Sequence, residues 1–137
     1  NGQGQIFADV KNFRMDYPGR DDMEIWYASL EGPEAGAYER GSGTLIDGEI
    51  TISFSDHFSM VIVEEGMTVM LTPLSGDSKG LAVIEKNNNG VTVKELFEGE
   101  GNYSFDWEVK GVRAGFERYE AVREKKKLGA FERIEKK

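Results

Sequence analysis

The clearest alternation of hydrophobic and polar positions in this chain runs over 103–109. Its apolar residues recur at every second position: Tyr103, Phe105, Trp107 and Val109. A period of two places these side chains on one face of a strand, so we expect that face to be buried, Trp107 included, and the other to be wet. Similar but weaker patterns predict extended segments over 5–15, 23–28, 37–45, 50–54, 67–74, 81–86 and 91–97.

Turn residues separate these segments. Asp47-Gly48 lies between two apolar runs and predicts a two-residue hairpin, and Asn87 to Gly90 predicts a second hairpin. Asp16 to Gly19, with Pro18 before glycine, predicts a tight turn, and Ser55 to Phe58 reads as a short capped helical turn. About eight short strands with regular turns indicate an all-β fold of short antiparallel strands, in a sandwich or barrel-like arrangement.

Two segments lack an obvious core face. The segment 37–45 carries Gly41 and Gly43 on one face and polar residues on the other. Such a strand suits a position covered by a partner chain or close to a symmetry axis. The leading segment 5–15 is a single strand that must pair with something. Together they predict a chain that completes its fold with sister subunits.

Composition narrows the possible functions. The chain has 137 residues, enough for one domain, and a formal net charge of -8, which argues against a nucleic-acid partner. It has no cysteine, so a disulfide framework, a thiolate zinc site and a cysteine nucleophile are excluded. We find no apolar window long enough for a membrane span and no signal-peptide pattern in the first five residues, so we expect no membrane insertion and a chain cut from within a longer one.

The stretch 26–41 carries the most specific local sequence. Glu31 and Glu34 lie on a turn stiffened by Pro33, with aromatic residues on both sides. Two nearby carboxylates suit a glycoside hydrolase. The alternative is that each carboxylate accepts backbone N–H groups and locks the turn.

His57 is the single histidine, and it follows Asp56 with serines nearby. A catalytic triad requires a spatial arrangement that this adjacency does not supply. A ring of three imidazoles on a threefold axis could hold a structural metal ion, and the alternative is a histidine at a turn or subunit contact. Trp26, Tyr27 and Tyr38 could stack on sugar rings or belong to the core.

Four segments resemble a known family. They read LEGPEAGAYERG at 30–41, DHF at 56–58, MTVMLTPL at 67–74 and FDWEVKGVR at 105–113. These are similar to the C-terminal, receptor-binding tip of phage long tail fibres and related trimeric bacterial surface proteins, over 13–123. The family's K-x-F-x-M segment followed by Asp-His-Pro is matched at 11–18, with Tyr17 in place of the histidine, so any role of that histidine does not carry over.

The resemblance implies an intertwined homotrimer at the distal end of a virion's tail fibre. It implies a neck and trimerisation arm over 1–22 and a β-rich receptor-binding head over 23–123. The run of charges over 124–137 indicates a charged tail, in which the three-residue spacing of Leu128, Phe131 and Ile134 makes a short helix over 128–134 possible. The partners expected are the upstream fibre shaft and a host bacterial receptor, a glycan or an outer-membrane component. Some relatives carry a self-cleaving chaperone here, whose motif we do not find in this chain.

We therefore expect a receptor-binding protein with no enzymatic activity and no cofactor beyond a possible structural ion at His57. The alternatives are a trimerisation cap without receptor binding and, as a lesser one, a glycoside hydrolase. The expected receptor contacts are Trp26, Tyr27, Glu31, Glu34, Tyr38, Arg40, Asp77, Lys79, Asn88 and Asn89.

Overall fold

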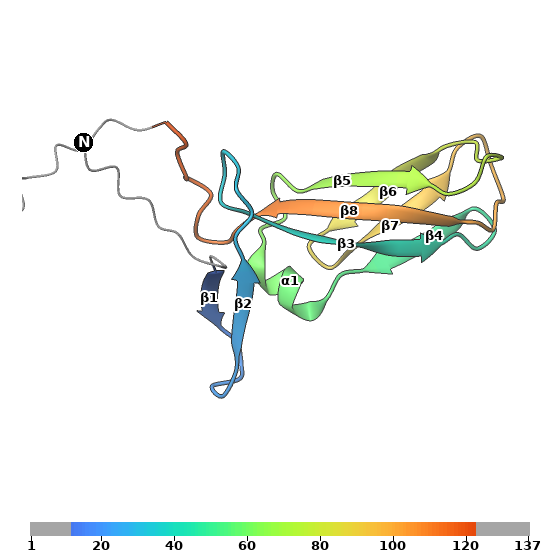
Figure 1. Cartoon of the computed structure of the whole chain (residues 1–137). Coiled ribbons are helices and arrows are strands. Elements are labelled where there is room, and N and C mark those ends of the chain that lie inside the picture. Colours follow the sequence, from blue (N-terminus) through green and yellow to red (C-terminus); the bar gives the residue numbers. More distant parts are fainter. Residues whose placement is uncertain (1–11, 123–137) are drawn as a thin grey trace, which may run out of the picture.

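A computed structural model describes residues 12–122 of the chain (Figure 1). It contains eight strands and one short helix among these residues: β1 (Asn12–Asp16), β2 (Glu24–Ala28), β3 (Gly36–Thr44), β4 (Glu49–Ser53), α1 (Asp56–Val61), β5 (Thr68–Pro73), β6 (Leu81–Asn87), β7 (Gly90–Glu95) and β8 (Ser104–Val112). The expectation of a mostly β fold with short strands is confirmed. The expected arm over 5–11 and helix over 128–134 lie outside the described residues.

The strands form three antiparallel sheets. β1 and β2 form a hairpin, while β3-β8-β5 and β4-β7-β6 form two three-stranded sheets. The two larger sheets lie one over the other, and the hairpin projects from one end at a steep angle (Figure 1). The core contains inner-face residues of both larger sheets together with α1; its largest fully buried side chains are Phe58, Phe105, Leu45 and Met67. Burial of these apolar groups is the main force that holds the sheets together.

The Asp47-Gly48 turn forms as predicted. Asp47 and Gly48 both have positive φ, 50° and 83°, and two backbone hydrogen bonds between Ile46 and Glu49 close the turn. The prediction that the flanking strands pair as a hairpin is wrong beyond this point. β3 pairs with β8 and β4 pairs with β7, so the chain crosses from one sheet to the other at this turn.

Two other predicted bounds differ. β7 ends at Glu95, whereas the sequence pattern extended the strand to Phe97, and β8 continues through Gly111 to Val112, whereas the alternation that predicted it ended at Val109. A Cβ atom added at Gly111 would lie 2.9 Å from Ile62 Cγ2. The glycine therefore lets Ile62, the residue after α1, approach β8 closely.

The glycines of β3 serve the core of their own chain. In the register of β3 with β8, Gly41 lies opposite Trp107 and Gly43 opposite Phe105. A Cβ at Gly41 would lie 2.9 Å from Trp107 Cζ2, and one at Gly43 would lie 2.9 Å from Phe105 Cζ. The missing side chains therefore make room for two aromatic rings. Packing within one chain therefore explains why β3 carries glycines, and no symmetry axis is needed to explain them.

The hairpin packs through one face. Phe13, Met15 and Tyr27 pack against the core, and the Arg113 guanidinium lies 3.8 Å from the Phe13 ring centroid. The expected boundary between 22 and 23 falls in the turn between β1 and β2, which pair over their whole length.

Across 12–122, none of the helical structure is long and apolar enough to traverse a bilayer.

Candidate ligand-binding face

The outer face of the β3-β8-β5 sheet carries polar side chains in ordered rows. Because residues alternate along each strand, the outward positions of the three strands meet in register. One row is Arg40, Glu108 and Met70; the next is Ser42, Asp106 and Thr72; a third is Tyr38, Lys110 and Thr68.

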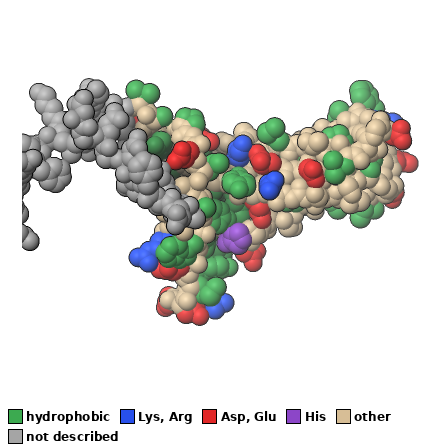
Figure 2. All heavy atoms as spheres, viewed as in Figure 1, with side chains coloured by type: hydrophobic (Ala, Val, Ile, Leu, Met, Phe, Trp, Pro, Cys, Tyr) green, Lys and Arg blue, Asp and Glu red, His purple; other side chains and the backbone are tan. Residues whose placement is uncertain are grey.

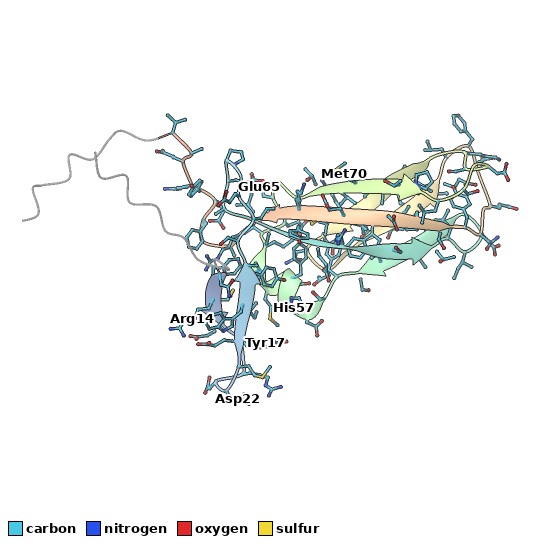
Figure 3. The ribbon with its side chains drawn as sticks, viewed as in Figure 1. Arg14, Tyr17, Asp22, His57, Glu65 and Met70 are labelled. Atoms are coloured by element: carbon cyan, nitrogen blue, oxygen red, sulfur yellow. The ribbon has the colours of Figure 1, made fainter. Side chains whose placement is uncertain are left out.

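A shallow hollow lies on this face. It has a volume of about 440 Å³ and is lined by side chains of the first two rows, with Gly41 and Trp107 completing its lining. Met70 is 66% exposed and Tyr38, in the adjoining row, is 45% exposed. Figure 3 labels Met70 on β5, at the upper side of the sheet. The hollow thus combines hydrogen-bonding groups with exposed apolar atoms.

Hydrogen bonds orient the polar groups of the hollow. Ser42 Oγ donates to Asp106 Oδ1 at 2.6 Å, and Lys110 Nζ lies 3.0 Å from Glu108 Oε1. Among the described residues, nothing pairs with the Arg40 guanidinium, although Glu108 lies opposite it in the register. Arg40 therefore has its N–H donors available for a ligand.

Charge on this face is balanced. Arg40 and Lys110 are cationic and Asp106 and Glu108 are anionic, so the four formal charges cancel, in contrast to the net charge of -8 for the chain. A polyanion gains little from such a surface, whereas a neutral molecule with many hydroxyl groups finds both donors and acceptors.

The turn with Glu31 and Glu34 adjoins this face. A second hollow of about 220 Å³ is lined by Lys110, which also belongs to the third row of the sheet, and by Leu30, Glu31, Gly32, Pro33, Glu34, Gly36 and Ala37. The structure therefore brings four of the expected contact residues, Glu31, Glu34, Tyr38 and Arg40, onto one continuous surface. The hydrolase role of the two glutamates stays a prediction.

The other expected contacts lie elsewhere. Asp77 and Lys79 are in the β5–β6 loop, and Asn88 and Asn89 form the β6–β7 turn. Asn89 has a structural role there, because its N–H bonds to Asn87 Oδ1 and its carbonyl accepts the Phe54 N–H at 2.8 Å.

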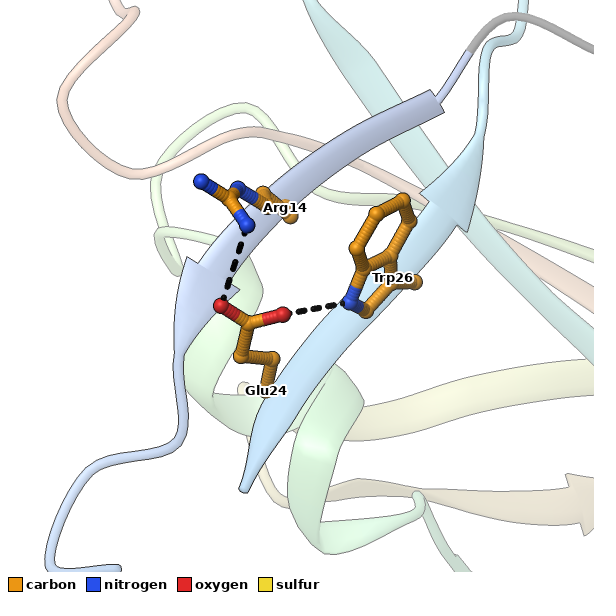
Figure 4. Close-up of polar contacts among 3 residues, drawn as sticks. All are labelled: Arg14, Glu24 and Trp26. Carbon is orange, nitrogen blue, oxygen red and sulfur yellow. Dashed lines mark hydrogen bonds and ion pairs between the residues drawn. The ribbon is translucent and has the colours of Figure 1, made fainter. Parts of the chain in front are cut away.

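Trp26 and Tyr27 point to opposite faces of the hairpin. Trp26 is 56% exposed, and its Nε1 donates to Glu24 at 2.9 Å while Arg14 contacts the same carboxylate (Figure 4). Tyr27 faces inward, with its hydroxyl 2.7 Å from His57 Nδ1. Burial, and then the charge of Glu39, raise the pKa of Tyr27 to about 12.

His57 lies in the angle between the hairpin and the larger sheets, next to hydrophobic side chains (Figure 2). Ser55 Oγ lies 3.3 Å from the same Nδ1 that contacts Tyr27, and the Ser55 N–H donates to both carboxylate oxygens of Glu39. A triad needs a carboxylate on the second ring nitrogen, and none is found there within 12–122. The same residues hold no group of three or more side chains able to bind a metal ion.

Comparisons with models of protein families, with curated proteins and with solved structures give no match for this chain.

The outer face of the sheet was not identified from the sequence beyond Tyr38 and Arg40. Asp106 and Ser42 are 64 residues apart, and only the register of β3 with β8 makes them neighbours.

Proposed function

We propose that this chain attaches a fibre to a cell surface by binding a neutral carbohydrate on the outer face of the β3-β8-β5 sheet. The observation that carries the proposal is the hollow formed by Arg40, Ser42 and Asp106 with Met70 at its side. The sheet fixes the spacing of these residues, and the hydrogen bond from Ser42 holds the Asp106 carboxylate in place before any ligand arrives, so little conformational entropy of this carboxylate is lost on binding.

The chemistry of the hollow suits a sugar ring. Hydroxyl groups both donate and accept hydrogen bonds, which matches Arg40 on one side and Asp106 and Glu108 on the other. The apolar face of a sugar can pack on exposed apolar side chains, and Met70 and Tyr38 supply these. The balanced charge of the face favours a neutral glycan over an anionic one.

The biological setting proposed is the distal tip of a trimeric phage tail fibre outside the cell, with the host bacterium bearing the receptor. A shallow site binds one sugar weakly, and three copies on one fibre raise the overall affinity through their effective concentration. The resemblance of 30–41 and 105–113 to tail-fibre tips supports this setting.

Binding to an array of neutral and anionic bacterial surface polysaccharides tests the proposal. We expect the full chain to bind neutral glycans, and Arg40→Ala or Asp106→Asn to weaken binding roughly tenfold, because each removes a hydrogen bond to a charged group. Thr51→Ala, on the outer face of the opposite sheet, is the matched control and should bind like the wild type. Equal binding by all three variants, or no binding by the wild type, would refute the proposal.

A trimerisation cap is the second candidate, favoured by the β1–β2 hairpin. This sheet has two strands only in the described part of the chain, so both of its edges lack a neighbouring strand there. A two-stranded sheet gains stability from further pairing. Sedimentation equilibrium of the full chain should give three times the 15.3 kDa of one chain. A single folded chain at micromolar concentration would refute the trimer.

A further inference from the structure

The turn after β7 presents a phenylalanine at the end of the molecule opposite the hairpin. Phe97 is 82% exposed. Phe97 and Glu98 have φ of 55° and 54°, and the Gly99 N–H donates to the Leu96 carbonyl at 3.1 Å. Two consecutive positive φ values are normal for Asn-Gly and unfavourable for Phe-Glu. The neighbouring turn also has two consecutive positive φ values, but at Asp47-Gly48, where they are favourable. The unfavourable pair Phe97-Glu98 is found in the turn at 96–99 and not in the turn at 46–49.

A buried carboxylate holds this turn in place. Glu95, 5% exposed, accepts hydrogen bonds from the Tyr103 hydroxyl and from the Gly101 N–H. Tyr103 in turn lies 2.6 Å from Ser78 Oγ in the β5–β6 loop. A Cβ at Gly99 would overlap the Glu95 carboxylate, so the glycine lets the turn fold over it.

Backbone hydrogen bonds join the loops at this end. Glu95 N–H donates to the Gly48 carbonyl at 2.7 Å, and Leu96 N–H donates to the Gly80 carbonyl at 2.9 Å. The turns at 46–49 and 96–99 and the loop at 75–80 therefore form one preorganised surface. Strain persists at such positions only when the surroundings enforce it, and it is concentrated at functional sites.

The turns and the loop at this end carry both exposed apolar and acidic side chains. Ile46 is 64% exposed and Leu96 is 40% exposed. The turns at 46–49 and 96–99 and the loop at 75–80, together with Glu100 beside them, contribute five acidic residues, Asp47, Glu49, Asp77, Glu98 and Glu100, and one lysine, Lys79. These acidic groups repel an anionic membrane and attract a cationic protein surface.

We propose that this end is a protein-docking surface in which Phe97 packs on an apolar surface of the partner that is flanked by lysine or arginine. An aromatic side chain fixed in an exposed position loses little entropy on binding, which is typical of residues that dominate interface energy. The contact is separate from the Arg40 hollow, which lies on the face of the sheet.

A synthetic amphipathic helix made of leucine and lysine reproduces the proposed partner chemistry and serves as the probe. Fluorescence anisotropy should show binding to the full chain that weakens as NaCl is raised. Phe97→Asn should weaken it at least about tenfold. It should also raise Tm by about 2–5 °C, because asparagine tolerates the left-handed region. Ile84→Asn, which removes an exposed apolar residue on β6, and Arg40→Ala should leave peptide binding unchanged.

Three results would overturn the proposal. The first is absent peptide binding, or equal binding by wild type and Phe97→Asn. The second is sedimentation of the wild type, but not of Phe97→Asn, with phosphatidylcholine vesicles, which would identify a membrane as the occupant. The third is a change of mass in solution on Phe97→Asn, which would identify a second copy of the chain. Since Arg40→Ala affects sugar binding only, a failure here is distinguishable from a failure of the carbohydrate site.

Discussion

The Tyr27 hydroxyl lies 2.7 Å from His57 Nδ1, across 30 residues of sequence, and this contact joins the β1–β2 hairpin to the start of α1. The two rings also meet edge to face, with centroids 5.7 Å apart. Figure 3 shows His57 on the helix, beside the hairpin that carries Arg14 and Tyr17. The contact therefore adds to the packing of Phe13 and Met15 in holding the hairpin against the rest of the molecule.

Removing this hydrogen bond should loosen the hairpin. We expect Tyr27→Phe to lower the free energy of unfolding by about 1 kcal/mol, because the hydrogen bond between Tyr27 and His57 is lost while the ring packing stays. Amide hydrogen exchange should accelerate in β1 and β2 and stay unchanged in β8. Tyr17→Phe is the control, because it removes a hydroxyl from the same hairpin that makes no hydrogen bond within residues 12–122. Uniform acceleration throughout the chain would contradict a local role.

Alkaline pH should weaken the same junction. The pKa of Tyr27 is raised to about 12 by burial and by Glu39, from an ordinary value of 10.0. The folded state then holds its proton more tightly than the unfolded state, so this stabilisation is complete below pH 10 and is lost as pH rises toward 12. Burial and the hydrogen bond to Glu95 also raise the pKa of Tyr103, so tyrosinate absorbance should show more than one phenol titrating late, and Tyr27→Phe should reduce the late step by one phenol. A wild-type titration without a late step would contradict the burial of this hydroxyl.

Acid should weaken the opposite end. The hydrogen bond from the Tyr103 hydroxyl lowers the pKa of Glu95 below its ordinary value of 4.5. A lowered pKa stabilises the folded state above the ordinary value, and the stabilisation is lost as pH falls below it. Glu95→Gln should therefore lower stability at pH 7 and flatten its dependence on pH below about 4.5. Urea unfolding at several pH values measures this, and parallel pH profiles for the two proteins would contradict it.

The β3 glycines predict a sharp contrast between positions. Gly41→Ala and Gly43→Ala should each destabilise the chain by about 1–3 kcal/mol, because a Cβ meets the Trp107 or Phe105 ring. Gly32→Ala, in the exposed β2–β3 turn where a Cβ meets nothing within 4 Å, should change stability by less than about 0.5 kcal/mol. Equal effects at all three positions would show that the glycines do not serve the aromatic rings.

Local pattern was sufficient for the strands and insufficient for their pairing. The alternation over 103–109 predicted β8, and the pair Asp47-Gly48 predicted the turn that it forms between β3 and β4. Both features depend on residues that are close in sequence. The role of Gly41 depends on Trp107, which is far along the chain, so the sequence alone suggested a subunit contact instead.

The same limit applies to the candidate sites. Tyr38 and Arg40 were expected as contacts, but the hollow needs Asp106 and Met70 from two other strands. Phe97 was assigned to a strand, because a hydrophobic residue after an apolar run reads as its continuation. Its positive φ is imposed by Glu95 and the loops around it, which no local pattern reveals.

Chemical-shift mapping with a neutral oligosaccharide taken from a glycan that the chain binds tests the central claim most directly. The carbohydrate site predicts saturable shifts at the backbone amides of Arg40, Ser42 and Asp106, with those of Thr51 and Thr92 on the opposite sheet unchanged. Shifts confined to the hairpin, to the Phe97 end or to the opposite sheet would contradict it.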